Sequence, residues 1–106
     1  MIISTTESIN GMEIVETIGL ISANSIRARH VGRDIMAGFR NLVGGEVLEY
    51  RKLLSDSRKE AVRRLEKKAS GSGANAVIGM RFMTSMVMGG AAEILAYGTA
   101  VVVRET

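Results

Sequence analysis

The strand-forming segments of this sequence are apolar on both faces, and this feature limits most strongly how the chain can fold. Residues 12–22 and 92–103 are rich in β-branched and aliphatic side chains, and neither segment has a polar face. Strands of this kind must be covered on both sides. One long amphipathic helix over residues 47–69 is available to cover them. Because a single helix covers only one face of a sheet, the pattern predicts that subunit contacts bury the other face.

The order of the elements predicts an α+β fold, namely a two-layer α/β domain with an antiparallel sheet, one short helix and one long helix. The predicted elements are a short edge strand at Ile2 and Ile3, a turn at Asn10-Gly11, a strand over residues 12–22, a short helix over residues 31–39, a glycine turn at Gly44-Gly45, the long helix, and two strands over residues 76–84 and 92–103 joined around Met88-Gly89-Gly90. With no proline, no repeat and no low-complexity segment, residues 1–106 form a single domain.

Composition excludes several classes of protein. The chain has no cysteine, which excludes disulfides and thiolate metal sites. It has no signal-peptide core and no apolar run of about 18 residues, so we expect a cytoplasmic protein that has no membrane partner. Residues 46–68 hold eight Lys/Arg and five Asp/Glu, which accounts for the whole formal charge of +3. The excess charge therefore belongs to one basic helix.

The segment from Arg27 to Glu49 carries the densest set of polar side chains, arranged on the short helix beside the glycine turn. In an oligomer it could line pockets between subunits for an anion, a metal or a small metabolite. The candidate ligand-binding residues are Asn24, Arg29, Arg33, Asp34, Arg40 and Asn41. An equally good interpretation is that Asp34 pairs with an arginine of a neighbouring subunit and fixes the assembly. The spacing of the glycine pair fits a turn and not a phosphate-binding loop.

Two sets of residues are candidates for holding a metal ion. His30 and Asp34 share a helix face at i,i+4, and thioether groups cluster near the predicted hairpin loop. Clustered thioethers can bind Cu(I). The candidate metal ligands are His30, Asp34, Met83, Met86 and Met88. The alternatives are a surface or capping role for the histidine, and core or interface packing for the methionines, which commonly fill apolar gaps.

Nucleic-acid binding is the alternative function that the charge pattern suggests. The basic half of the long helix would contact phosphates through Arg58, Lys59, Arg63, Arg64, Lys67 and Lys68. No aromatic residue interleaves with these cations, so single-strand stacking lacks a platform, and a solvated helix face explains the same pattern. We expect no enzymatic activity, because the chain offers no cysteine nucleophile, no recognisable Ser-His-acid arrangement and one histidine.

Several segments resemble a known family. The stretches IISTT, GMEIVETIGLI, GRDIMAGFRNLVGGE, GANAVIG and GAAEILAYGTAV are similar to the YbjQ family of small bacterial and archaeal proteins, often labelled heavy-metal-binding. The resemblance covers nearly the whole chain. It implies a dodecin-like subunit of order β-α-β-β, assembled as a pentameric ring, with a metal ion as the suggested ligand and no established reaction. We therefore expect a homo-oligomeric binding or scaffold protein.

Overall fold

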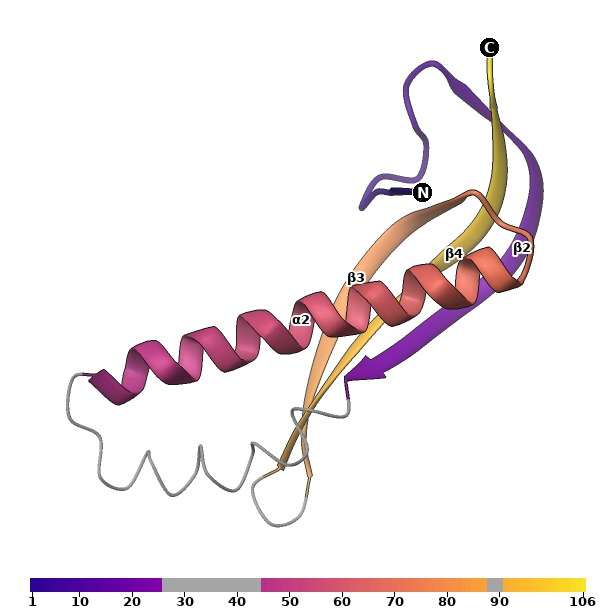
Figure 1. Cartoon of the computed structure of the whole chain (residues 1–106). Coiled ribbons are helices and arrows are strands. Elements are labelled where there is room, and N and C mark those ends of the chain that lie inside the picture. Colours follow the sequence, from indigo (N-terminus) through magenta and orange to yellow (C-terminus); the bar gives the residue numbers. More distant parts are fainter. Residues whose placement is uncertain (26–44, 88–90) are drawn as a thin grey trace.

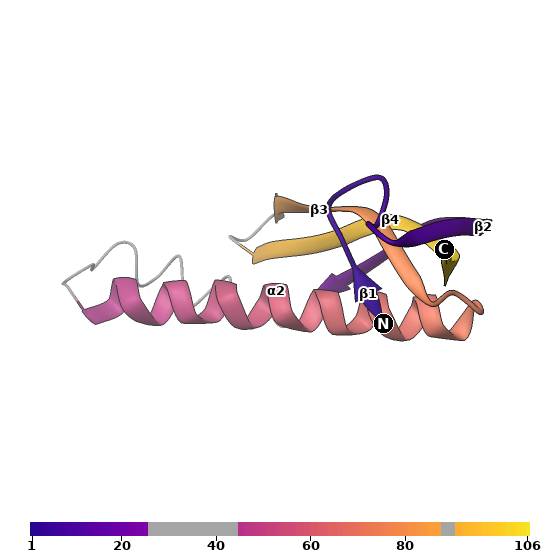
Figure 2. The same cartoon turned by 90° about the horizontal axis from the view of Figure 1, so that it is seen from above.

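A four-stranded sheet packs against one long helix in the computed structural model (Figures 1 and 2). The structure describes residues 1–25, 45–87 and 91–106. Its elements are β1 (Ile2–Ile3), β2 (Met12–Ser25), α2 (Gly45–Gly71), β3 (Ala76–Val87) and β4 (Ala91–Glu105). The α+β class, the strands and the long helix are confirmed. The predicted short helix over residues 31–39 and the loop at residues 88–90 lie outside the described residues.

The sheet is mixed, whereas the sequence predicted an antiparallel one. Its strand order is β1-β3-β4-β2, with β4 antiparallel to both of its neighbours. The short β1 pairs in parallel with β3, placing Ile2 opposite Ala76 and Ile3 opposite Val77. The direction of β1 could not be predicted because β1 does not pair with the strand that follows it in the chain, so no hairpin turn determines its orientation.

Strand β2 does not keep the simple alternation of faces that the sequence predicted for residues 12–22. Its pairing with β4 shifts register twice, between Ile14 and Glu16 and again between Thr17 and Gly19. At each shift one extra residue enters the strand and the alternation of faces changes phase, so the second shift restores the phase that the first one changed. The strand also continues to Ser25. The two shifts cancel beyond Gly19, so the departure from regular alternation is confined to residues 15–18.

The principal core lies between α2 and β4. Ala61, Leu65 and Ala69 lie at i,i+4 spacing along the helix and are 0% exposed. They belong to the same buried cluster as Ile94 and Ala96 of β4. Burying a leucine side chain contributes about 1.5–3 kcal/mol. The small alanine side chains on both elements let the helix lie close to the sheet. The apolar stripe predicted for this helix is therefore the side that packs on the sheet.

The opposite face of the sheet is partly covered by the N-terminal segment of the chain. Val101 and Val103 of β4 are buried there, with Ile9 and Met12 packed against them. Figure 2 shows the segment between β1 and β2 passing over the side of the sheet that faces away from α2. This internal cover was not predicted, and it reduces the apolar surface that remains for a partner.

We predict that Gly98 tolerates no side chain. A Cβ atom there would lie 2.9 Å from both the Ile78 carbonyl oxygen and Val77 Cγ1. The substitution Gly98→Ala should lower the free energy of unfolding by about 1–3 kcal/mol through overpacking. The control is Gly71→Ala at the end of α2, where a Cβ would meet nothing within 4 Å. Urea denaturation at one protomer concentration compares the two variants, and equal stabilities would contradict the prediction.

Candidate functional site

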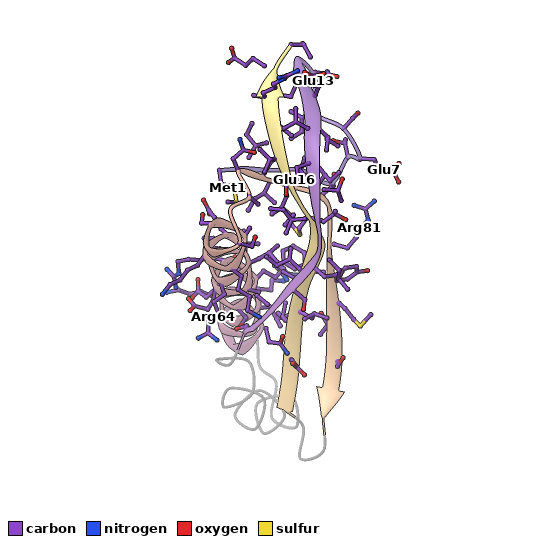
Figure 3. The ribbon with its side chains drawn as sticks, turned by 90° about the vertical axis from the view of Figure 1, so that its right-hand side faces the viewer. Met1, Glu7, Glu13, Glu16, Arg64 and Arg81 are labelled. Carbon is purple, nitrogen blue, oxygen red and sulfur yellow. The ribbon has the colours of Figure 1, made fainter. Side chains whose placement is uncertain are left out.

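A cationic hollow lies between the second half of α2 and the end of β2. Its volume is ≈ 530 Å³. It is lined by Ala23, Asn24, Arg64, Lys67 and Lys68. Figure 3 shows Arg64 projecting from the helix. The spacing of the three basic residues, i, i+3 and i+4, puts them on one side of the helix, where their side chains converge on the last residues of β2.

Two of these cations hold the edge strand directly. Arg64 Nη1 donates a hydrogen bond to the Asn24 carbonyl oxygen at 3.3 Å, and Lys68 Nζ donates one to the Ser22 carbonyl oxygen at 2.9 Å. Strand β2 is the last strand of the sheet, so an added strand would compete for these carbonyl groups. The two side chains therefore attach the helix to β2 and block this part of its edge.

Two carboxylates partly offset the positive charge. Arg64 Nε donates to Glu60 Oε1 at 3.1 Å, and Glu60 also pairs with Arg63. The Asn24 amide Nδ2 donates to Glu93 at the start of the apolar β4. The Glu60 side chain is 13% exposed and that of Arg64 is 37% exposed. The hollow thus combines three cations with two nearby carboxylates and keeps an excess of positive charge.

These internal contacts bear on the predicted nucleic-acid surface. Arg63 and Arg64 are paired with Glu60, and Lys68 bonds to β2. Three of the six basic residues proposed to contact phosphates are therefore engaged within the subunit. The alternative of nucleic-acid binding gains no support from this arrangement.

Few of the ligand candidates chosen from the sequence fall in the described part of the chain. Asn24 lines the hollow. The other candidates lie outside the described residues and stay predictions, namely Arg29, His30, Arg33, Asp34, Arg40, Asn41 and Met88. Met83 is 51% exposed on β3, while Met80 packs against the core cluster beneath α2. Met86 was predicted in a loop, but its backbone belongs to β3 and pairs with Ala92.

Sequence reasoning named Arg64, Lys67 and Lys68 as candidate phosphate contacts but missed that they line a hollow beside β2. They were assigned to a uniformly solvated or phosphate-binding helix face. Their spacing was visible, but their partners are backbone carbonyl groups of β2, and a sequence does not show which strand lies beside a helix. The sequence therefore showed the spacing of the basic residues on the helix, but it did not show the backbone carbonyl groups of β2 that they contact.

A second surface of the same strand is apolar. In the first part of β2, six consecutive side chains from Glu13 to Ile18 are exposed. The apolar members of this surface, called the β2 strip below, are Ile14, Val15, Ile18 and Leu20, exposed by 41%, 48%, 38% and 82%. Isolated exposed aliphatic residues are ordinary, but these four lie within seven positions and form an exposed apolar surface.

Among the helices in the described ranges, none is long and apolar enough to cross a membrane.

Comparisons with known proteins agree on one family. The YbjQ family model, described as "Putative heavy-metal-binding", matches residues 1–104. A UPF0145 protein of Methanosarcina acetivorans is 55% identical over 101 residues, covering 95% of each chain. A UPF0145 protein of Dehalococcoides mccartyi is 52% identical over 104 residues, covering 98% of this chain and 100% of the relative.

One solved structure supports the fold. It is a crystal structure of a protein with unknown function from Pediococcus pentosaceus that belongs to the DUF74 family, with a TM-score of 0.51 and 20% sequence identity. The match covers 100% of this chain and 98% of the other.

The described residues hold no cluster of histidine, cysteine and carboxylate side chains suited to a heavy-metal cation. Across residues 1–25, 45–87 and 91–106, no group of three or more His, Cys, Asp or Glu is placed to hold a metal ion. The side chains that converge in the hollow are instead cations, which disfavour a metal cation and favour an anion.

We predict that Glu60 is the carboxylate that matters most for the stability of this region. The substitution Glu60→Gln should cost about 1 kcal/mol of unfolding free energy, because Arg63 and Arg64 lose a partly buried partner. The control is Glu13→Gln, which breaks the pair with Arg104 at 2.5 Å, where both side chains are well exposed. Its expected cost is below about 0.5 kcal/mol. Chemical denaturation measures both, and an equal loss would contradict the prediction.

Proposed function

The chain belongs to the YbjQ family, whose model is described as "Putative heavy-metal-binding" and whose relatives are named UPF0145 proteins, and from this premise we propose a homo-oligomeric binding protein. The subunits assemble as a pentameric ring, and a small anionic ligand binds in the cationic hollow. The number of subunits comes from the family resemblance. The assembly and the ligand class are supported by the features below.

The observation that carries the oligomer is the exposure of the β2 strip, above all of Leu20 at 82%. The shape of the subunit points the same way. Its radius of gyration is 16.6 Å, with extents of 55 × 24 × 17 Å. A compact chain of this length has a radius of about 13 Å. An elongated subunit with an apolar edge strand is typical of a chain that completes its core by association.

The ligand class follows from the charges around the hollow. Arg64, Lys67 and Lys68 outnumber Glu60 and Glu93, so the site attracts an anion and repels a cation. Phosphate-like ligands carry oxygen acceptors that lysine and arginine bind well. The heavy-metal description of the family is compatible with these charges when the metal is the centre of an oxyanion, such as molybdate or tungstate.

We predict that the protein purified without a metal-affinity tag is an oligomer of the 11.4 kDa chain, with five subunits. Native mass spectrometry measures the mass, and elemental analysis of the same sample reports any bound phosphorus or metal. A mass of one subunit at micromolar concentration would contradict the assembly. A different number of subunits would contradict only the pentamer.

We also predict opposite effects of two substitutions on anion binding. Isothermal titration with inorganic phosphate and with molybdate should show affinity weakened by Lys67→Met and strengthened by Glu60→Gln, each by about threefold to tenfold, because one charge is removed from the hollow. The control is Lys52→Met on an exposed part of α2 outside the hollow. Added salt should weaken binding.

Titrations with phosphate, with molybdate and with a metal cation distinguish the possible ligands. Phosphate binding with no preference for molybdate assigns the site to phosphate-like groups. A preference for molybdate supports a metal oxyanion. Unchanged affinity for both anions in Lys67→Met, or binding of Zn²⁺ or Cu⁺ alone, would contradict an anion site in the hollow.

A further inference from the structure

We propose that the groove between α2 and β3, called the α2–β3 groove below, binds a mononucleotide. The base stacks on the ring of Phe82, and the phosphate group lies against Arg58 and Lys59. The groove and the cationic hollow lie on opposite sides of α2, so this is a second site that does not depend on the anion proposed for the hollow.

The α2–β3 groove has a volume of ≈ 540 Å³. Helix α2 crosses β3 on one side of the sheet (Figures 1 and 2). The helix residues of the lining recur every three or four positions, which places them on one side of the helix. They are Ser55, Arg58, Lys59, Val62, Arg63 and Glu66. Strand β3 supplies Phe82 as the aromatic residue of the lining.

The pairing of β3 with β4 places Phe82 on the side of the sheet that α2 covers. Phe82 lies opposite Ala96, which belongs to the same buried cluster as Ala61 and Leu65 of the helix. Residues that face one another across two strands lie on the same side of the sheet. Phe82 nevertheless remains 41% exposed. Its ring therefore offers aromatic surface to a ligand in the groove.

The fold supplies the aromatic surface that the basic part of the helix lacks. No aromatic residue lies between the cations from Arg58 to Lys68 in the sequence. Phe82 comes from another element and lines the groove together with Val62 and the cations. Every nucleobase has a flat π-face that stacks on an aromatic ring. The apolar part of the groove therefore suits a planar base.

The charges of the groove favour a phosphate beside that base. Its lining holds the cations Arg58, Lys59 and Arg63 and the carboxylate of Glu66. Among the described residues, Arg63 pairs with Glu60, whereas no ion pair engages Arg58 or Lys59. Both of these side chains are exposed, and arginine and lysine bind phosphate oxygens well. An aromatic ring beside two available cations matches a base joined to a phosphate.

The same features favour one nucleotide over a strand of nucleic acid. Proteins that bind single strands stack successive bases on several aromatic side chains. Within the described part of the chain, the groove has one such side chain, Phe82. Glu66 also ends the row of cations on the helix, where its charge would repel a continuing phosphate backbone.

Tryptophan fluorescence tests the stacking, because the natural chain has no tryptophan. In Phe82→Trp, adenosine monophosphate (AMP) should quench the indole fluorescence in a saturable way. Ribose 5-phosphate should not quench it, because it has no base. Adenosine should bind at least about tenfold more weakly than AMP, because it has no phosphate for the cations to bind.

Substitution of the cations, made in the Phe82→Trp protein, locates the phosphate. Arg58→Gln should weaken AMP binding by about threefold to tenfold, because one charge is removed from the groove. The matched control is Lys67→Gln, which removes one charge from the other side of the helix, in the hollow. It should leave the affinity for AMP within about twofold.

The natural phenylalanine is tested by NMR with fluorine-labelled phenylalanine, of which the chain has two. AMP should shift the resonance that is missing from the spectrum of Phe82→Leu, and ribose 5-phosphate should leave it in place. This measurement uses the natural side chain at position 82 and does not depend on the fit of an indole ring.

Several results would overturn the inference. They are the absence of any effect of millimolar AMP, an equal effect of AMP and ribose 5-phosphate, and an equal loss of affinity in Lys67→Gln and Arg58→Gln. Stronger binding of a short single-stranded oligodeoxyadenylate at equal nucleotide concentration would also overturn it, in favour of nucleic acid. None of these results bears on the anion proposed for the hollow, which the titrations with inorganic phosphate and molybdate test separately.

Discussion

The contact between one helix and four strands is the constraint on which the rest of this structure depends. Ala61, Leu65 and Ala69 bury one stripe of α2 against β4, and no second helix among the described residues covers another part of the sheet. The N-terminal segment covers some of the opposite face through Ile9 and Met12. What neither element reaches is the first half of β2, where apolar side chains remain exposed. The exposed apolar surface of β2 is thus the part of the sheet that packing within the subunit does not cover.

Different parts of the chain cover the two edges of the sheet. At the end of β2, side chains from α2 take up carbonyl groups that an added strand would need, as lysines do at many edges. At the start of β3, the chain supplies β1 and the residues after it. Within residues 1–25, 45–87 and 91–106, each edge therefore has one part that is bonded and one part along which no strand is paired. This partial closure limits the registers in which two copies can pair, because only the open parts can meet without breaking hydrogen bonds inside a subunit.

The sequence predicted the elements well and their detailed geometry less well. The stripe on α2 and the β-rich runs were visible because periodic patterns carry that information. The two bulges of β2 were not, since Val15 and Ile18 suit a regular strand as well as a bulge, and only pairing with β4 reveals the extra residues. The hollow was missed for a related reason. Its cations act on backbone carbonyl groups, which look alike at every position of a sequence. Of the ligand candidates, Asn24 lies in the hollow, because it stands near the end of β2, beside the helix.

The charge of the hollow decides which form of ligand fits the description of the family. The three cations Arg64, Lys67 and Lys68 outnumber the carboxylates Glu60 and Glu93 by one charge. For an illustrative separation of roughly 6 Å and an effective dielectric constant between 20 and 80, one such charge would disfavour a divalent cation by about 1–5 kcal/mol and favour a dianion by a similar amount. The difference between the two ligands is twice this value, which at the lower dielectric constant exceeds what a single hydrogen bond could reverse. If the proposed anion site is correct, a heavy metal would enter this hollow as an oxyanion and not as a bare cation.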